Sequence, residues 1–504
     1  MKSQRAYWIA FALCAAASAV PFLVTYRMPM TDLPEHAAQL TIWKHYDDSC
    51  YGFAQLYYKD WFTPYLVGYA IARLFAIVLS VNAALKLTAY CAVVALPLSL
   101  RVLLRRASTD DFLSLLGFPL AFGFSFYYGF LNFIVAVPLG MLFVACSFDY
   151  TATPTKRRAA TLVALSLLLL ASHALVYAFC LTIAIAMQIA ARRSNLLPYV
   201  LSMPPAVAWV VRVDRHEPTI RLPVRWLEVF TRPANFLWRL LGSGWDPLAT
   251  VFALLFAAAV YLIGVRPATD RRRWVPLILA LLCYFALPSQ AFGTAALFER
   301  FAVFIAAFAL FALDRRASRT TAAAHALIVF LTIIWMTILT IRFHRFARDA
   351  ANFDRVVDAL PVNARLLFLD VDPGSIDVPG VLFLHFEAYY QERKGGVIGR
   401  SFATHFPELI RYRRGSDPGV FLYLDWNPWM LDWNRDGAKF DWFLVRAPGN
   451  IHDAIFAGAP EGLDLQQHAG MWWLYARRNR PLPSHCVPFA PDNREATFAE
   501  KSPD

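Results

Sequence analysis

Long apolar runs alternate with short basic segments over the first two thirds of the chain. Runs close to the roughly 20 residues that a helix needs to cross a bilayer recur between Tyr7 and Phe343. The basic segments are Arg105-Arg106, Lys156-Arg157-Arg158, Arg192-Arg193, Arg271-Arg272-Arg273 and Arg315-Arg316. We predict a polytopic membrane region whose basic loops face the cytoplasm, because Lys and Arg collect on that side.

Each apolar block has a polar break in its middle, which we expect to form an outer turn. The breaks are Tyr127-Tyr128-Gly129, Ser172-His173, the stretch from Asp214 to Asp246 and the stretch from Gln290 to Glu299. The run from Tyr7 to Val24 is long enough to span, so we interpret it as an uncleaved first helix rather than a signal peptide. A final run from Ala326 to Ile341 then leaves the membrane.

The number of crossings stays open in two places. The stretch from Thr63 to Leu104 has the pattern of two spans broken near Val81-Asn82, yet the charge pattern requires an odd number of crossings there. Residues 159–190 form either a pair of spans or one long helix. We predict about 11 to 13 spans, with residues 26–62 and the chain after residue 345 on the same external face.

From about Phe346 the pattern becomes that of a water-soluble α/β domain. Strand-like runs are separated by Gly, Pro and Asp turns; they lie at Arg365–Leu369, Val420–Leu424, Phe440–Val445 and Trp472–Tyr475. Helix-like stretches run from Asp349 to Leu360 and from Val381 to Glu392. The predicted organisation is a transmembrane domain at 1–345, which includes the first external loop at 26–62, and a soluble external domain at 346–504.

Composition agrees with a membrane protein. Hydrophobic residues make up 58% of the chain and charged residues 17%, against roughly a quarter charged in ordinary globular proteins, and mean hydropathy is +0.44. This excludes a disordered chain or a nucleic-acid-binding module. The formal charge of +12 follows from basic cytoplasmic loops. The chain has no Walker A loop, no GxGxxG after a strand and no HExxH, so ATP-driven transport, nucleotide-cofactor chemistry and zinc proteolysis find no support.

Two of the seven cysteines, Cys50 and Cys486, lie outside apolar runs. The predicted topology places both on the external face, which is an oxidising compartment if the membrane is a bacterial inner membrane. We therefore predict a disulfide between the first loop and the C-terminal domain. The alternative is two free thiols too far apart to bond.

The first external loop carries the clearest chemical signal. Asp32, Glu35 and His36 lie within five residues, directly after the first span. A carboxylate in such a place can act as a general base on an alcohol, or can hold a divalent metal. The structural alternative is a helix N-cap, because Asp32 precedes Pro34 at the start of a helix that continues to His45.

Together these features resemble the GT-C class of integral-membrane glycosyltransferases, of the protein mannosyltransferase and aminoarabinose transferase type. The resemblance covers about residues 1–345. It rests on the D-x-P-x-H motif of the first loop together with Thr63-Pro64-Tyr65, Gly129-Phe130-Leu131-Asn132-Phe133, Ser172-His173 and Glu299-Arg300-Phe301. It implies a GT-C-like fold and a polyprenyl-phosphate sugar as donor substrate.

The resemblance also implies roles for residues. Asp32 matches the acidic residue that activates the acceptor hydroxyl for inverting attack, with Glu35 and His36 as helpers. Arg300 matches the arginine that binds the carrier phosphate; pairing with Glu299 is the structural alternative. His173 is either an outer-turn residue or a cavity-lining group. Asn132 bridges helices or contacts a sugar.

The implied function is sugar transfer in the cell envelope, from the lipid-linked donor to an external glycan, lipid or protein acceptor. The protein would be a multi-pass inner-membrane protein with a periplasmic or otherwise external C-terminal domain, in contact with membrane lipid and with no nucleic-acid partner. A different class stays open: a non-catalytic transporter or flippase-like protein for lipid-linked sugars, in which Asp32 and Arg300 bind a substrate in transit. A structural assembly factor is a third possibility.

Several arginines also lie in the outer stretch from Asp214 to Asp246, at positions 215, 221, 225, 232 and 239. External arginines oppose the usual charge bias of membrane proteins. We consider two partners for them, a lipid-linked phosphate and the anionic headgroups of the membrane.

Overall fold

The computed structural model describes residues 2–216, 223–291, 294–315, 320–405, 407–460 and 462–479, together with residues 486, 488 and 489. Its contacts divide the chain into two compact units. The first comprises Met1–Leu23, Phe62–Ala70 and Thr88–Ile341, and the second comprises Val24–Trp61, Ile71–Leu87 and Arg342–Asp504. Most of the predicted first external loop therefore packs in the same unit as the C-terminal part of the chain.

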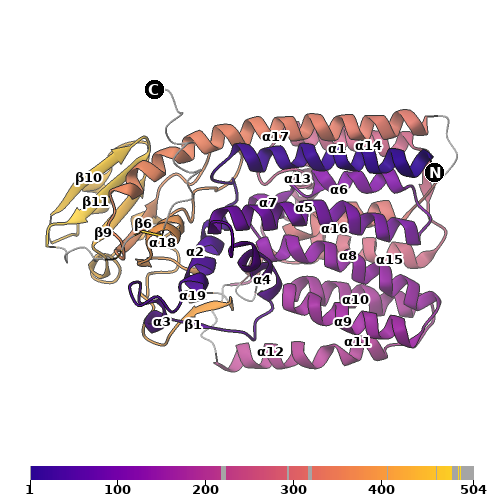
Figure 1. Cartoon of the computed structure of the whole chain (residues 1–504), viewed down its shortest axis with the longest axis horizontal. Helices are drawn as coiled ribbons and strands as arrows, with labels where there is room; N and C mark the ends of the chain where they lie inside the picture. The colour runs from indigo at the N-terminus through magenta and orange to yellow at the C-terminus, as the bar shows by residue number, and fades with distance from the viewer. Residues whose placement is uncertain are drawn as a thin grey trace. The chain divides into compact units, whose positions relative to one another are not determined.

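Helices dominate the first unit, and they begin and end near the breaks expected from the hydrophobic pattern (Figure 1). The longer ones are α1 (Lys2–Val24), α8 (Leu131–Ala152), α9 (Lys156–Ser172), α10 (Ala174–Ala190), α12 (Met203–His216), α14 (Pro247–Leu262), α15 (Trp274–Ala286) and α16 (Ala302–Phe311). Shorter elements are η1 (Asp111–Leu116), α6 (Gly117–Leu120), α7 (Phe124–Tyr127), α11 (Leu197–Leu201), α13 (Arg232–Arg239), η2 (Arg271–Arg273) and η3 (Glu299–Phe301).

Two short antiparallel strand pairs accompany these helices. Strand β2 (Val265–Pro267) pairs with β5 (Leu313–Arg315), and β3 (Gln290–Ala291) pairs with β4 (Thr294–Ala295). The second pair lies within the predicted break from Gln290 to Glu299, so a hairpin followed by η3 separates α15 from α16.

Three further helices contribute residues to both units. Helix α4 (Leu66–Phe75) ends before α5 (Val81–Arg106) begins, which confirms the break predicted near Val81-Asn82. Helix α17 (Thr321–Asp358) is continuous over 38 residues. It joins the last apolar run to the helix predicted from Asp349, where we expected two separate elements.

By length and composition, four helices in the described part of the chain can cross a membrane: Gln4–Val24, Val81–Arg106, Leu131–Ala152 and Thr321–Asp358. Shorter apolar helices of 10–17 residues add to them, at Leu66–Phe75, Asp111–Tyr127, Ala174–Ala190, Leu197–Val213 and Pro247–Leu262. These helices support the predicted helical membrane region. The number of spans stays a prediction.

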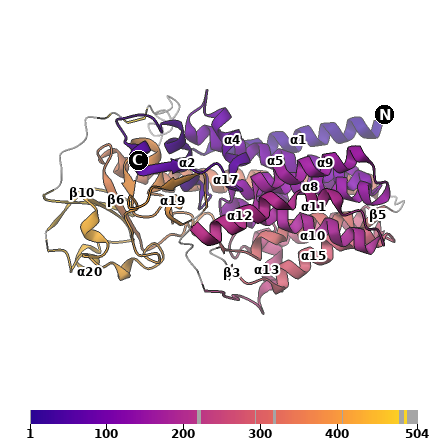
Figure 2. The same cartoon turned by 90° about the horizontal axis from the view of Figure 1, so that it is seen from below.

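Within the first unit, α8 packs against both α9 and α10 (Figure 2). Helix α15 packs against α16. Aromatic rings fill the spaces between them. The Phe179 ring of α10 lies 4.9 Å from that of Phe301 and 5.0 Å from that of Phe304, measured between centroids. This packing brings the start of α16 to α10 and so fixes the position of the adjoining η3.

The second unit is built around a sheet with strand order β10-β11-β9-β6-β7, five-stranded in the described part of the chain. Its strands are β6 (Arg365–Asp370), β7 (Val397–Ile398), β9 (Trp442–Arg446), β10 (Leu463–Ala469) and β11 (Trp472–Arg477). Strand β6 pairs in parallel with β7 and β9, whereas β11 pairs antiparallel with β9 and β10. Three of the four predicted strands are thus present.

The predicted strand Val420–Leu424 is wrong. Its residues form turns, with the amide of Leu424 donating to the carbonyl of Phe421. The carboxylate of Asp436 accepts from the amide of Phe421 at 3.0 Å. Such side-chain bonds to the backbone compete with strand pairing, and the strand-like composition did not reveal this one.

The predicted helix Val381–Glu392 starts later than expected, as α18 (Ala388–Lys394). The residues before it form successive turns in which Leu384 and Phe386 donate to the carbonyls of Val381 and Phe383. Helix α2 (Leu33–Lys44) packs against α18. The remaining elements of the unit are α3 (Phe53–Leu56), β1 (Tyr57–Lys59), α19 (Phe402–His405), β8 (Ile410–Tyr412), η4 (Pro428–Met430), η5 (Gly437–Lys439) and α20 (His452–Ile455).

Candidate active site

The candidate residues fall into two groups, one within each unit. Asp32, Glu35 and His36 belong to the second unit. Residues 132, 173, 299 and 300 belong to the first.

Asp32 lies at the start of α2, which begins with Pro34 in its first turn. Its side chain makes no capping hydrogen bond to the helix. The carboxylate therefore does not act as the N-cap that the sequence offered as an alternative. Asp32 is 7% exposed, and its Oδ1 lies 3.5 Å from Nε2 of His385. The carboxylate therefore faces an imidazole from the C-terminal part of the same unit.

Glu35 is fully buried, and its Oε2 accepts a hydrogen bond of 3.0 Å from the amide of Phe402. Its other oxygen has no hydrogen-bond partner among the described residues. Burial raises the pKa of Glu35 to about 8, although the Phe402 amide and the Arg400 guanidinium act in the opposite direction. Burial and the Glu35 carboxyl likewise raise the pKa of Glu387. The site therefore holds buried carboxyl groups whose protons are retained to higher pH than usual.

His36 packs against the ring of Phe402, the residue whose amide binds Glu35. It is 3% exposed, and its ring meets that of Phe402 edge-on with centroids 5.6 Å apart. One turn further along α2, Gln39 bonds both the amide and the carbonyl of Ile410, at 2.9 and 3.1 Å. Helix α2 is thus anchored along its length to residues 402–410.

Arg300 lies in η3, at the N-terminal side of α16. Its guanidinium donates to the carbonyls of Ala296 and Ala295, at 3.0 and 3.1 Å, and lies 3.7 Å above the Phe130 ring. One of its nitrogens is 3.5 Å from Nε2 of His173. These contacts hold the guanidinium plane by backbone and ring interactions, and the neighbouring Glu299 carboxyl also interacts electrostatically with it.

His173 occupies the break between α9 and α10, as the sequence predicted. It is 4% exposed, and its ring meets the rings of Tyr65 and Phe133 edge-on, at 5.3 and 5.4 Å. Its Nδ1 has no hydrogen-bond partner in the described part of the chain. His173 is therefore a buried residue beside Arg300 rather than an exposed turn residue.

Asn132 lies at the start of α8 and is 3% exposed. Neither its carbonyl oxygen nor its amide nitrogen has a hydrogen-bond partner among the described residues. The backbone of Gly68 in α4 packs against this amide so closely that a side chain at position 68 would collide with it. Asn132 contacts another helix, but it does not bridge the two by a hydrogen bond.

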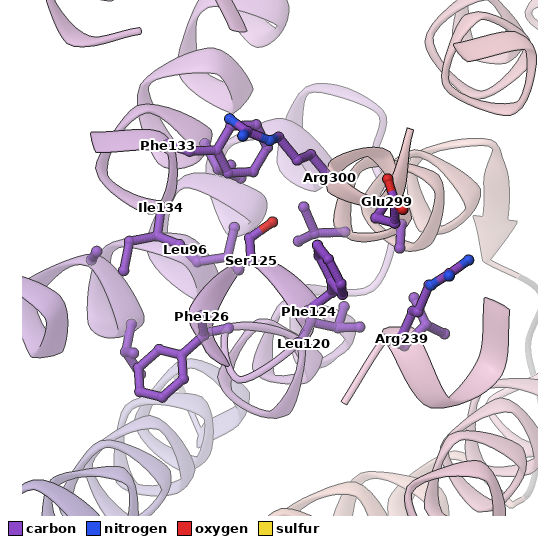
Figure 3. Close-up of a pocket in the computed structure, with 18 residues that line it drawn as sticks. Leu96, Leu120, Phe124, Ser125, Phe126, Phe133, Ile134, Arg239, Glu299 and Arg300 are labelled. Atoms are coloured by element: carbon purple, nitrogen blue, oxygen red, sulfur yellow. The ribbon is translucent and has the colours of Figure 1, made fainter. Parts of the chain in front are cut away.

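A small pocket lies beside Arg300 and Glu299 (Figure 3). Arg239, Glu299 and Arg300 line one side of it, and apolar residues that include Leu96 and Ile134 line the other. Glu299 is 8% exposed, and its Oε2 has no hydrogen-bond partner among the described residues. The pocket thus combines two guanidinium groups and a carboxyl with an apolar wall.

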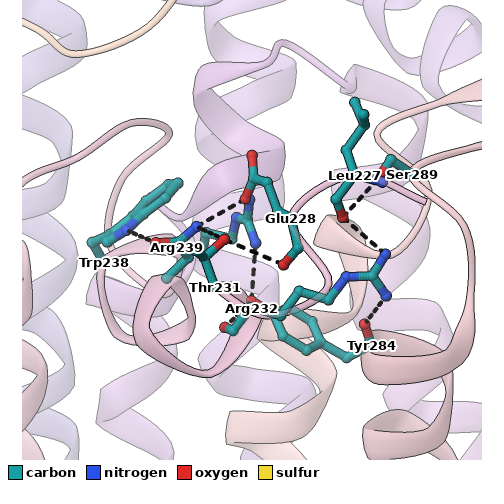
Figure 4. A network of polar contacts seen from close by, with 9 residues as sticks. Leu227, Glu228, Thr231, Arg232, Trp238, Arg239, Tyr284 and Ser289 are labelled. Atoms are coloured by element: carbon teal, nitrogen blue, oxygen red, sulfur yellow. Dashed lines mark hydrogen bonds and ion pairs between the residues drawn. The ribbon is translucent and has the colours of Figure 1, made fainter. Parts of the chain in front are cut away.

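Two arginines of the outer stretch, Arg232 and Arg239, are buried and form hydrogen bonds within the protein. Arg232 is fully buried and donates to the carbonyls of residues 227, 284, 285 and 287. Arg239 pairs with Glu228 and donates to the Tyr284 hydroxyl at 3.1 Å (Figure 4). Binding to headgroups at the surface is therefore wrong for Arg232, because its side chain is fully buried and both of its Nη atoms donate to backbone carbonyls. Arg225 is exposed. The side chain of Arg215 and the whole of Arg221 lie outside the described part of the chain.

Cys50 and Cys486 form a disulfide, with Cα atoms 5.7 Å apart, which confirms the predicted bond. In the described part of the chain, no three His, Cys, Asp or Glu side chains are grouped so that they could hold a metal ion.

Sequence reasoning did not find His385, Glu387, Arg400 or Phe402 as neighbours of the acidic loop. These residues lie more than 350 positions from Asp32, in segments with no motif of their own. The one available signal was the polar pair His385 and Glu387 within an apolar run.

Comparison with known proteins identifies solved structures with a similar fold. No protein-family model matches the chain, and no curated protein sequence matches it. Among solved structures, ArnT from Cupriavidus metallidurans bound to undecaprenyl phosphate matches with a TM-score of 0.56 and 10% identity, over 93% of this chain and 98% of ArnT. Arabinofuranosyltransferase AftD from Mycobacteria matches with a TM-score of 0.49 and 13% identity, over 94% of this chain and 40% of AftD.

ArnT is a GT-C glycosyltransferase, and such enzymes are polytopic membrane proteins. At 10% identity the match with ArnT concerns the fold. The chain therefore has the fold of a GT-C membrane protein, a polytopic helical region with a C-terminal sheet domain, as its motifs predicted.

Proposed function

We propose that the protein is an inverting membrane glycosyltransferase that moves a sugar from a polyprenyl-phosphate donor to an external glycan, lipid or protein acceptor. The observation that carries the proposal is a set of buried polar atoms in the helical unit that have no hydrogen-bond partner among the described residues. They belong to His173 and Glu299, which lie next to Arg300, and to Asn132 at the start of α8. Buried polar groups without partners are costly, and a polar ligand such as a sugar phosphate would supply the missing hydrogen bonds.

Arg300 is proposed to bind the carrier phosphate. A guanidinium presents a planar fork that suits phosphate oxygens, and the contacts with Ala295, Ala296 and the Phe130 ring hold this fork in one orientation. The undecaprenyl phosphate bound to ArnT supports a carrier of this class. The apolar wall of the pocket suits the start of a prenyl chain.

Asp32 is proposed to act as the general base. The acceptor hydroxyl oxygen forms a bond to the anomeric carbon while the bond from that carbon to the phosphate oxygen breaks. The hydroxyl proton passes to the Asp32 carboxylate, and the electron pair of the broken bond stays on the polyprenyl phosphate. Attack opposite the leaving group inverts the anomeric centre. Glu35 and His36 are proposed to support the loop that carries this carboxylate.

The protein is further proposed to be a multi-pass protein of a bacterial inner membrane, with the chain after residue 345 in the periplasm. The disulfide between Cys50 and Cys486 supports an oxidising compartment for the unit that contains both. The partners in this location are membrane lipid, the lipid-linked donor and an envelope glycan or lipid.

The proposal is tested with the full-length protein in proteoliposomes supplied with undecaprenyl-phosphate sugars and an envelope extract as acceptor. Transfer is measured as release of undecaprenyl phosphate together with gain of one sugar mass on an acceptor. If the donor is bound or moved across the bilayer but no undecaprenyl phosphate is released, the transferase proposal is overturned and the carrier alternative is favoured. Mass spectrometry of glycans and lipids from cells with and without the protein then identifies the acceptor.

A further inference from the structure

His385 brings the C-terminal part of the second unit to the proposed base. It lies in the turns before α18, and its Nε2 is 3.5 Å from Oδ1 of Asp32. Both residues are buried, His385 at 3% and Asp32 at 7% exposure. The two side chains are 353 positions apart in the sequence, so only the folded unit creates this pair.

The imidazole of His385 is uncharged at neutral pH. Burial lowers its pKa well below the usual range, and the nearby Arg400 guanidinium lowers it further. A neutral imidazole carries one N–H, and a carboxylate oxygen 3.5 Å from Nε2 favours the tautomer with the proton on that nitrogen. In unliganded enzymes such contacts are often long and shorten when substrate binds.

Other charged groups surround this pair. Glu35 lies one turn along α2, and its carboxyl interacts electrostatically with Asp32, Arg400 and Glu387. Arg400 forms an ion pair with Asp425. The Arg400 guanidinium thus interacts with several carboxyl groups at once. The neutral imidazole of His385 can orient the Asp32 carboxylate without adding a second positive charge.

We propose that His385 is a positioning residue for the transfer reaction, whose Nε2–H holds one oxygen of Asp32 so that the other oxygen faces the acceptor hydroxyl. The inference rests on the proposed function. It makes the C-terminal part of the chain a contributor to catalysis, beyond any role in binding the acceptor. A general base depends on such orientation, because small misplacement of a reacting group costs large factors in rate.

The test is a double-mutant cycle on the full-length protein, with Asp32→Asn, His385→Leu and the combined variant. His385→Leu is expected to lower kcat about 10- to 100-fold while donor affinity is unchanged, and to have no further effect once Asp32 is Asn. His385→Gln retains an N–H donor and is expected to recover most of the rate. The matched control is His468→Leu, at an exposed histidine whose Nε2 bonds the carbonyl of Gly470 in its own hairpin; its rate is expected to stay within about twofold of wild type.

A pH profile separates positioning from a general loss of structure. A donor to the ionised carboxylate lowers its pKa, so loss of His385 is expected to move the acid limb of the kcat profile to higher pH. Equal losses in His385→Leu and His385→Gln, or the same loss with and without Asp32, would overturn the inference. Failure of the proposed function appears separately, as absence of transfer by the wild-type protein. In that case, additive shifts of Tm across the same cycle would overturn the contact, and non-additive shifts would uphold it.

Discussion

The side chain of Glu35 accepts a hydrogen bond of 3.0 Å from the backbone amide of Phe402, which lies 367 positions later in the chain. This bond joins α2, the helix of the acidic loop, to the start of α19. It leaves one carboxyl oxygen of Glu35 buried without a hydrogen-bond partner among the described residues. The burial that forms the site therefore also makes the charged form of Glu35 unfavourable.

Glu35 is expected to make stability depend on pH. Its pKa is raised to about 8 in the folded protein, against roughly 4.3 for an exposed glutamate. Between these values the folded state holds a proton that the unfolded state has released, so the Glu35 contribution to the free energy of unfolding falls as pH rises from about 5 to 8. Glu35→Gln is expected to raise Tm by a few degrees at pH 8 and to leave it unchanged at pH 5.

The measurement is the difference in Tm between wild type and Glu35→Gln at each pH, which cancels the contributions of buried carboxyl groups that do not interact with Glu35, such as Asp370. A difference that is the same at pH 5 and pH 8 would show that Glu35 titrates in its ordinary range.

Asp32→Asn keeps the size of the side chain but removes the proposed base. The rate of sugar transfer is expected to fall by about 10²- to 10⁴-fold, the usual cost of losing a proton-transfer group. Donor binding and Tm are expected to stay near wild type. Transfer at the wild-type rate by purified Asp32→Asn protein would show that Asp32 is not the general base.

Arg300→Lys retains the charge but loses the planar fork of the guanidinium. Affinity for undecaprenyl phosphate is expected to fall about tenfold, and Arg300→Ala is expected to lower it further. Binding is measured directly in detergent, with Arg266→Lys as the control, because Arg266 is exposed on β2. Unchanged binding in Arg300→Ala, together with a lower protein yield, would indicate a structural role instead.

The close approach of Gly68 to Asn132 predicts a steric phenotype. Gly68→Ala places a methyl group against the Asn132 amide, and overpacking of this kind typically costs about 1–3 kcal/mol. Truncation of the neighbour in Gly68→Ala/Asn132→Ala is expected to restore stability, measured as Tm.

A matched control for this series is Gly449→Ala, since a Cβ at that glycine would meet no atom within 4 Å. The single variant Asn132→Ala separates the ligand role from packing: loss of donor binding without loss of Tm supports contact with the sugar phosphate. Equal stability of Gly68→Ala and wild type would contradict the packing described for α4 and α8.

The disulfide between Cys50 and Cys486 is expected to appear as one cross-linked peptide pair in non-reducing peptide mapping. Cys50→Ser is expected to lower Tm, because removal of a native disulfide often costs about 2–5 kcal/mol in small secreted domains, and less where packing already restricts the chain. Cys91→Ser, at a free exposed cysteine, is the control. Separately alkylated Cys50 and Cys486 peptides would contradict the bond.

The helical membrane region follows from the hydrophobic pattern alone, because a helix that crosses a bilayer must be apolar over its whole length and the polar breaks mark its ends. The sequence also located the start of α2 at Asp32 and Pro34, and the buried strands β6, β9 and β11, since these are local patterns. It also predicted Arg300 and His173 as site residues, both from short motifs at the ends of apolar runs.

Which side chains come into contact depends on the tertiary fold. The pairing of Asp32 with His385, the burial of Glu35 under Phe402 and the contact of Asn132 with Gly68 all join segments distant in sequence, and no local pattern encodes them. The same holds for Val420–Leu424, whose composition favours a strand while the Asp436 carboxylate binds its backbone in turns. Hydrogen bonds and burial of polar groups depend on the neighbours that folding supplies, and so does the chemistry of the candidate site.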